Sequence, residues 1–303
     1  MIVITAPTGD IGGKVLRTLL DHHPEEALRV IVRDPAKLPQ SVTDRVDVIV
    51  GSHADPGVID RAFQGADAVF WLVPPDPHAP SLDAAFSGFT AAAAQRFATS
   101  GVGNVVGVSA LGRGTAVADR AGLVTASLAV DDLLSASGVA YRALANPSFM
   151  ENILRQLDSI RDDGIYTDTV TPDRMAPSAA TGDIAAAAVR LLTDRSWSGT
   201  GSVAVLGPHD VSAEDMAAVM SEVLGRPVRY ERESYEALAA RLTGFGLGEA
   251  FVTGMVDMMR AKDQGLDDGV PRTPETASPT TFRQWCQEVL LPAVHASTTT
   301  GVK

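Results

Sequence analysis

The stretch MIVITAPTGDIGGKV, residues 1–15, joins an apolar run to a turn that contains three glycines. Its pattern predicts a buried strand over 1–6 and an amphipathic helix over 11–23. Small residues in such a turn permit a tight reversal, close approach of the backbone to a pyrophosphate and close packing of the helix. The free amides and the dipole at the start of the helix favour an anion. The stretch predicts either a dinucleotide phosphate site or an ordinary tight turn, and its neighbours decide between them.

Apolar segments and helical patterns alternate through the first half of the chain. Continuous apolar strands separated by helices are typical of a parallel sheet covered on both faces, and right-handed crossovers make it doubly wound. We therefore expect an α/β fold: a Rossmann domain over 1–150, a smaller α/β lobe over 151–295 that is partly interleaved with the Rossmann sheet, and a disordered tail over 296–303. Further strands are expected over 28–33, 46–51, 68–73, 104–109, 140–145 and 202–207, and helices over 81–101, 125–138, 149–161 and 181–195.

Composition narrows the class of protein. The 303 residues carry a net charge of −12, which disfavours direct binding to nucleic acid. The single cysteine, Cys286, excludes a disulfide within the chain, and with the absence of a secretory leader pattern it predicts a cytoplasmic protein. No run of 18 apolar residues predicts a membrane span. The few His, Cys and acidic residues have no metal-ligand spacing, and the Asp131–Asp132 pair is expected on a solvated helix face.

The end of the second strand bears on the cofactor. Arg33 lies where an acidic residue would bind the ribose hydroxyls of NAD, and Lys37 follows four residues later. A guanidinium at this place suits a 2′-phosphate, so NADP(H) is favoured over NAD(H). The alternative is that these are solvated loop charges. Asp10 either lies close to the phosphate or caps the first helix.

With these residues in view, the chain resembles the NmrA-like group of atypical short-chain dehydrogenases. This group includes quinone-oxidoreductase-type and triphenylmethane-reductase-type enzymes as well as redox-sensing regulators. The chain departs from its pattern at Ala6, where the first glycine usually stands, at Ser52, usually acidic, and at Ala145–Asn146, usually Arg-Pro. The similar stretches are TAPTGDIG (5–12), VRDPAK (32–37), GADAVFWLVPP (65–75), NVVGVSALG (104–112), SGVAYRALANPSFMENIL (137–154) and SPTTFRQW (278–285).

The resemblance implies a Rossmann fold with NAD(P) bound at the first glycine turn. The Tyr-x-x-x-Lys pair of ordinary short-chain dehydrogenases is absent, because none of the four tyrosines has a lysine four residues later. Hydride transfer would then depend on positioning, which suits electron-poor acceptors such as quinones or conjugated systems. In a doubly wound sheet, ligands lie beyond the carboxyl ends of the strands.

Candidate residues are taken from those strand ends. His78 is either a proton donor or a solvated loop residue, and Ser109 either contacts the nicotinamide or the substrate oxygen or caps a strand end. Phe149 and Met150 line a pocket or pack the core, and the cluster Met255, Met258 and Met259 is core or faces a flat substrate. The expected cofactor site comprises Thr8, Gly9, Asp10, Ile11, Gly12, Arg33, Lys37, Val73, Pro74, Ser109, Asn146, Pro147 and Ser148, the substrate pocket comprises Pro75, His78, Leu111, Phe149 and Met150, and the catalytic candidates are His78 and Ser109.

These observations favour an NAD(P)H-dependent oxidoreductase that transfers a hydride to a small conjugated or quinone-like substrate. One alternative is a non-catalytic NAD(P)-sensing regulatory protein of the NmrA type. Another is a tailoring reductase or isomerase of secondary metabolism. The expected partner is a small aromatic or conjugated substrate, whereas the regulator alternative would bind a partner protein. The protein is expected to be a monomer or a homodimer.

Overall fold

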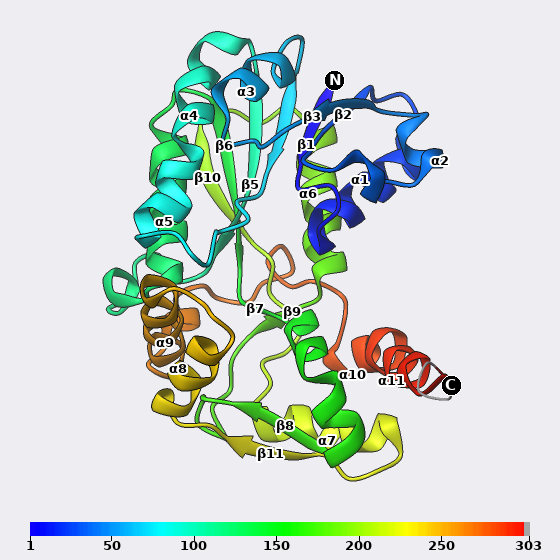
Figure 1. Cartoon of the computed structure of the whole chain (residues 1–303), viewed down its shortest axis with the longest axis vertical. Helices are drawn as coiled ribbons and strands as arrows, with labels where there is room; N and C mark the ends of the chain where they lie inside the picture. Colours follow the sequence, from blue (N-terminus) through cyan, green and yellow to red (C-terminus); the bar gives the residue numbers. More distant parts are fainter. Residues whose placement is uncertain (300–303) are drawn as a thin grey trace. The chain divides into compact units, whose positions relative to one another are not determined.

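Seven strands form one sheet in the order β10-β6-β5-β4-β1-β2-β3 (Figure 1). The computed structural model describes residues 1–299 of the chain. Neighbouring strands from β3 through to β5 pair in parallel, and β1 lies between β2 and β4, so the chain reverses its direction of winding there. The strands are β1 (Ile2–Thr5), β2 (Leu28–Val32), β3 (Asp47–Val50), β4 (Ala68–Trp71), β5 (Asn104–Ala110), β6 (Ala140–Asn146) and β10 (Thr200–Ala204). The expected doubly wound α/β fold is confirmed.

Apolar strands account for the burial of this sheet. Ile2, Val3 and Ile4 of β1 have no exposed surface, and β4 is buried throughout. Helix α1 directs Val15, Leu16 and Leu19 inward and leaves its polar residues outside, as its amphipathic pattern predicts. The helices associated with this sheet are α1 (Asp10–His22), α2 (Gln40–Thr43), α3 (Pro56–Ala62), α4 (Phe89–Ser100), α5 (Leu123–Ser135) and α6 (Thr181–Thr193).

The chain divides into two units that are each continuous in space but not in sequence. Unit 1 comprises Met1–Ala110, Val124–Ala145 and Ile184–Val203, and unit 2 comprises Leu111–Leu123, Asn146–Asp183 and the chain from Ala204 onward. Strand β10 therefore belongs to the large sheet although it follows residue 150. The expected domain boundary at residue 150 and the disordered tail over 296–303 stay predictions, and residues 300–303 of that tail lie outside the described residues.

Unit 2 has its own core, in which Met150, Tyr166, Met220, Trp285 and Leu290 are buried together. The strands described in this unit form two short parallel pairs, β8 with β11 and β7 with β9. Its strands are β7 (Ser148–Phe149), β8 (Ile165–Asp168), β9 (Ser178–Ala179) and β11 (Arg229–Arg232), and its helices are α7 (Ala213–Leu224), α8 (Tyr235–Gly244), α9 (Glu249–Asp263), α10 (Phe282–Trp285) and α11 (Leu291–Thr299). No helix in the described part of the chain is both long and apolar enough to cross a membrane.

Side-chain capping sets the start of α7. The Ser212 hydroxyl accepts from the Asp215 amide at 3.0 Å, and the Asp215 carboxylate accepts from the Ser212 amide at 3.0 Å. This reciprocal arrangement is a capping box, in which Asp215 takes the place of the more usual Glu or Gln.

The expected helix over 149–161 is present as a helical backbone over 150–163, but most of it is not α-helical. It consists of a 3-10 helix over Met150–Gln156 and a π-helix over Ser159–Asp163, joined by a short α-helical link. The Gln156 side chain bonds both backbone groups of Thr167, at 2.7 and 2.8 Å, and the Ser159 hydroxyl donates to the Ile165 carbonyl at 3.1 Å. These bonds attach the segment to β8.

Candidate functional site

The turn between β1 and α1 combines a left-handed backbone with a helix start that no side chain caps. Ala6 has φ 48°, a region that L-residues enter at some cost, and the Gly9 amide donates to the Ala6 carbonyl at 3.0 Å. Gly9 is the N-cap of α1 and supplies no side-chain hydrogen bond. The first amides of α1 therefore lack a side-chain acceptor, which suits the binding of an anion.

Gly12 makes this close turn possible. A Cβ at this position would lie 2.2 Å from the Ala6 carbonyl oxygen and 3.0 Å from that of Thr5. Both atoms belong to the backbone of the preceding turn, so they have little freedom to move. Gly12 thus lets α1 begin directly against the end of β1, as the sequence predicts for a phosphate turn.

Asp10 does not cap the helix. It is the first residue of α1, and its carboxylate forms an ion pair with the Lys14 ammonium at 2.8 Å, four residues later. Because Lys14 offsets its charge, the carboxylate repels an anion at this helix end less than an isolated one would.

Two cations lie just beyond β2, the strand that pairs with β1. Arg33 and Lys37 are both exposed, and neither forms an ion pair within residues 1–299. Asp34, between them, is engaged locally, because its carboxylate accepts from the Ala36 amide at 3.1 Å and begins a 3-10 turn over Pro35–Lys37. The two cations are therefore available to a phosphate group.

His53, which the sequence analysis did not single out, lies three residues after the end of β3. His53 is 6% exposed, and its ring nitrogen Nε2 bonds the Leu72 carbonyl at 2.9 Å. Its ring contacts Trp71 and Phe89 edge-on, with centroids 5.1 and 4.7 Å away. Burial lowers the pKa of His53 from 6.5 to about 4, and the positive charge of Arg33 adds to this effect. The Ser52 hydroxyl next to it accepts from the Ala54 amide. This position therefore has a neutral hydroxyl in place of the acidic side chain that is usual there.

The carboxyl end of β4 is fixed to β1 by a hydroxyl. Thr5 donates to the Phe70 carbonyl at 3.0 Å and accepts from the Leu72 amide at 2.9 Å. The candidates Val73, Pro74, Pro75 and His78 follow directly. His78 is exposed, and its amide donates to the Asp76 carboxylate in a local turn at 2.9 Å. Its role as a proton donor stays a prediction.

Ser109 belongs to a buried polar cluster. Its hydroxyl donates to the Asp131 carboxylate at 2.5 Å, and the Tyr141 hydroxyl donates to the second oxygen of that carboxylate at 2.6 Å. Asp131 is 5% exposed, so the expectation of a solvated pair is wrong for Asp131, whereas Asp132 is exposed. Helix α5 turns its first aspartate toward β5 and β6, where two hydroxyls compensate its charge. Contact of Ser109 with a ligand stays a prediction.

The remaining candidates lie in unit 2. The Leu111 amide donates to the Asn146 carbonyl at 2.9 Å, and Leu111 is buried. Pro147 and Ser148 continue into β7. The Glu151 carboxylate accepts from the Thr181 amide at 2.9 Å. It therefore binds the first residue of α6.

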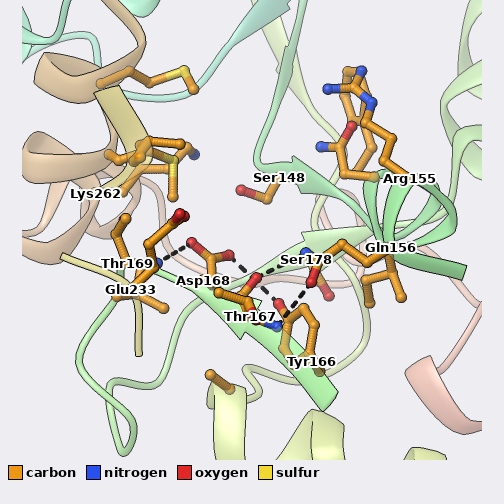
Figure 2. A pocket seen from close by; sticks show the side chains of 18 of the residues that line it. Ser148, Arg155, Gln156, Tyr166, Thr167, Asp168, Thr169, Ser178, Glu233 and Lys262 are labelled. Atoms are coloured by element: carbon orange, nitrogen blue, oxygen red, sulfur yellow. Dashed lines mark hydrogen bonds between the residues drawn. The ribbon is translucent and has the colours of Figure 1, made fainter. Parts of the chain in front are cut away.

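A cavity of about 510 Å³ lies within unit 2 (Figure 2). Ser148, Phe149 and Met150 line it, whereas Leu111 does not, and Pro75 and His78 belong to unit 1. The Met cluster of α9 lines this cavity, and contact of these methionines with a substrate stays a prediction. Sequence analysis missed the other polar lining residues, among them Tyr166, Asp168, Thr169, Arg174, Ser178, Glu233, Arg241, Lys262 and Asp267.

The family follows from comparison with known proteins. A model of an NAD(P)H-binding family matches residues 7–195. The chain belongs to this NAD(P)H-binding, NmrA-like family. The (4-alkanoyl-5-oxo-2,5-dihydrofuran-3-yl)methyl phosphate reductase of Streptomyces griseus is 32% identical over 80% of each chain. An NAD(P)H azoreductase of Xenophilus azovorans is 29% identical, over 85% of this chain and 86% of its own. Quinone oxidoreductase 2 of Escherichia coli is 26% identical over 89% of each.

Solved structures of family members share the fold. The NADPH complex of an Escherichia coli NADPH-dependent quinone oxidoreductase has a TM-score of 0.75 at 24% identity, covering 98% of this chain and 100% of its own. Triphenylmethane reductase of Citrobacter sp. with NADP(H) has a TM-score of 0.77 at 18% identity, covering 97% and 100%. The transcriptional regulator NmrA with NADP has 0.68 at 14% identity, covering 98% and 97%. The resemblance expected from the sequence is confirmed.

Proposed function

We propose that this protein is an NADPH-dependent reductase that transfers a hydride to a small, electron-poor conjugated acceptor, such as a quinone or an enone. The observation that carries the proposal is the uncapped, glycine-lined start of α1 beside the unpaired cations Arg33 and Lys37. The relatives support the class of reaction, because their names describe reductases of a quinone, an azo compound and an oxo-dihydrofuran.

The residues present fit the cofactor of this family. The α1 amides of Ile11 and Gly12 would bind the pyrophosphate, and Arg33 with Lys37 would bind the 2′-phosphate that distinguishes NADP from NAD. The bound cofactor would supply the hydride. Because a Tyr-x-x-x-Lys pair is absent from the sequence, this chain must provide the proton in another way.

The alternatives from the sequence have less support. Similarity to NmrA at 14% identity concerns the fold alone, so an NAD(P)-sensing regulator stays a prediction. A tailoring reductase is compatible with the proposed chemistry, since the Streptomyces griseus relative acts on an oxo-dihydrofuran that bears an alkanoyl group.

Arg33→Ala tests the cofactor preference. Loss of one charge-assisted bond, about 1.5–3 kcal/mol, should weaken NADPH binding about 10- to 100-fold and leave NADH binding unchanged. The measurement is calorimetric titration with each dinucleotide, followed by NADPH oxidation with menadione, a naphthoquinone. Arg190→Ala, which removes an exposed cation of α6 in the same unit, is the matched control. Equal loss of NADPH and NADH affinity in Arg33→Ala, or no NADPH oxidation by the wild type with any quinone or enone, would contradict the proposal.

A further inference from the structure

The apolar wall of the unit 2 cavity contains a group of methionines among other aliphatic and aromatic side chains. Five of the eight methionines in the chain line it: Met150, Met216, Met255, Met258 and Met259. Thioether side chains are polarizable and adapt their shape, and they form favourable contacts with aromatic rings. Such a wall suits a flat, conjugated molecule, and a volume of about 510 Å³ lies within the range of small-ligand sites.

Two of the four cations that line the cavity, Lys262 and Arg241, pair with carboxylates of the same lining, whereas Arg174 pairs with Asp268, which lies outside the lining. Lys262 pairs with buried Asp267 at 2.7 Å, and Arg241 forms two bonds to Glu233, at 2.7 and 3.0 Å. Of the three carboxylates that line the cavity, only Asp168 forms no ion pair within the described chain. Its carboxylate accepts from the Thr169 amide at 2.6 Å and from the Tyr166 hydroxyl at a long 3.4 Å.

Two buried hydroxyls of the lining have no hydrogen-bond partner among residues 1–299. Thr169 and Ser178 are each 2% exposed, and neither hydroxyl oxygen is bonded to protein. Buried polar groups are normally satisfied by protein, water or a ligand, so these two hydroxyls can form hydrogen bonds to a polar group placed in the cavity. Figure 2 shows Asp168 between Ser148 and Tyr166, with Ser178 and Thr169 on either side of it. The polar end of the cavity thus offers hydroxyls and one carboxyl group.

We propose that this cavity binds the hydride acceptor, a planar conjugated carbonyl compound, and that Asp168 is the catalytic residue that donates a proton to its oxygen. Thr169 and Ser178 donate hydrogen bonds to the same polar end of the ligand. This inference rests on the proposed function, because the reductant is the NADPH of that reaction.

The step balances as follows. The acceptor gains a hydride, and with it two electrons, so that a negative charge comes to lie on its oxygen. The O–H bond of the Asp168 carboxyl breaks, and its proton forms a new O–H bond on the acceptor. The carboxylate that remains takes a proton from water. The net change is acceptor, NADPH and one proton to reduced acceptor and NADP⁺.

The surroundings of Asp168 favour its protonated form. Burial raises the pKa of Asp168, while the Thr169 amide and the positive charge of Lys262 oppose this effect. The other titratable or charged groups that face it are Tyr166 on β8, Tyr230 on β11 and Arg241 on α8. Because Lys262 and Arg241 each have a carboxylate partner of their own, they stabilise the Asp168 anion less than free cations would.

Binding is tested without turnover, by calorimetric titration of the cofactor-free protein with menadione. Met258→Trp fills the cavity and should weaken menadione binding at least tenfold, while NADPH binding stays at the wild-type value. Met175→Trp is the matched control, because Met175 is 49% exposed in the same unit and does not line the cavity. Unchanged menadione affinity in Met258→Trp would overturn the placement of the acceptor.

Turnover tests the role of Asp168. Asp168→Asn keeps an acceptor for the Thr169 amide but has no acidic proton, so kcat with menadione should fall about 100-fold or more while KM stays within about threefold. In the wild type, kcat should fall as pH rises through the pKa of Asp168, and this fall should be absent in Asp168→Asn. Asp163→Asn, an exposed carboxylate of the same unit, should match the wild type.

The outcomes separate the two proposals. If the wild type reduces menadione and Asp168→Asn keeps its kcat and pH profile, Asp168 is not the proton donor, although the proposed function holds. If the wild type reduces no quinone or enone, the proposed function fails, and the proton-donor role fails with it, whereas the menadione titration still decides whether the cavity is a binding site.

Discussion

Replacing Gly12 by alanine tests the central geometry of the cofactor turn. The added Cβ would lie 2.2 Å from the Ala6 carbonyl oxygen and 2.9 Å from its carbon. Real Cβ atoms keep more than 3.0 Å from such neighbours, so α1 and the turn must separate by about 1 Å. Both partners are backbone, and a rotamer change cannot relieve the contact.

The expected cost follows from this overlap. Overpacking that moves backbone costs about 3 kcal/mol, which corresponds to a fall in Tm of about 5 °C for a chain of this size. The displacement also moves the amides of α1 away from the proposed position of the pyrophosphate, so NADPH should bind at least about tenfold more weakly. Thermal unfolding followed by circular dichroism gives the first value, and calorimetry gives the second.

Gly182→Ala is the matched control. Gly182 is exposed in the first turn of α6, and nothing lies within 4 Å of its added Cβ. Alanine is preferred to glycine in a helix by about 0.5–1 kcal/mol, so this variant should be as stable as the wild type or slightly more stable. A Gly12→Ala protein that keeps the Tm and NADPH affinity of the wild type would refute the close approach of α1 to the turn.

Two further predictions concern residues around the same site. Ala6→Gly should raise the free energy of unfolding by about 1 kcal/mol, measured in urea, because glycine adopts φ 48° without strain; a less stable variant would show that Ala6 is not strained. His53 has its folded pKa lowered from 6.5 to about 4, so the unfolded chain binds the extra proton first and stability is lost as pH falls between these values. Between pH 7 and about pH 4.5 the wild type should lose about 2 kcal/mol more than His53→Gln, and equal losses in the two proteins would contradict the buried neutral ring.

The sequence predicts the fold and the cofactor turn because local patterns determine both. Continuous apolar runs that alternate with helices are typical of strands in a parallel sheet, and the Gly12 spacing follows from a backbone contact between residues six apart. The same local patterns predict a helix over 149–161 but not its 3-10 and π-type geometry. There the side chain of Gln156 bonds to Thr167 of β8, and such a contact with a residue eleven positions later leaves no periodic signal.

Polar side chains are harder to place than apolar ones. Asp131 and Asp132 are adjacent and chemically identical, yet one is buried with two hydroxyls and the other is exposed. The helical spacing of α5 shows that they point in different directions, but it does not show that Ser109 and Tyr141 face one of them. Identical sequence signals therefore correspond to opposite electrostatic environments.

The cavity of unit 2 illustrates the same limit on a larger scale. Its lining comes from β8, α9 and the segment after β7, which are separated by up to a hundred residues in the chain. The spacing of the methionines on α9 is compatible with a packed core or with the wall of a pocket. Which of the two forms depends on whether side chains of other elements fill the volume next to the methionines. Here a carboxyl and two unbonded hydroxyls oppose the methionines. Polar groups in the wall of a cavity can fix the orientation of a bound molecule, so the proposed ligand site depends on the polar residues more than on the methionines.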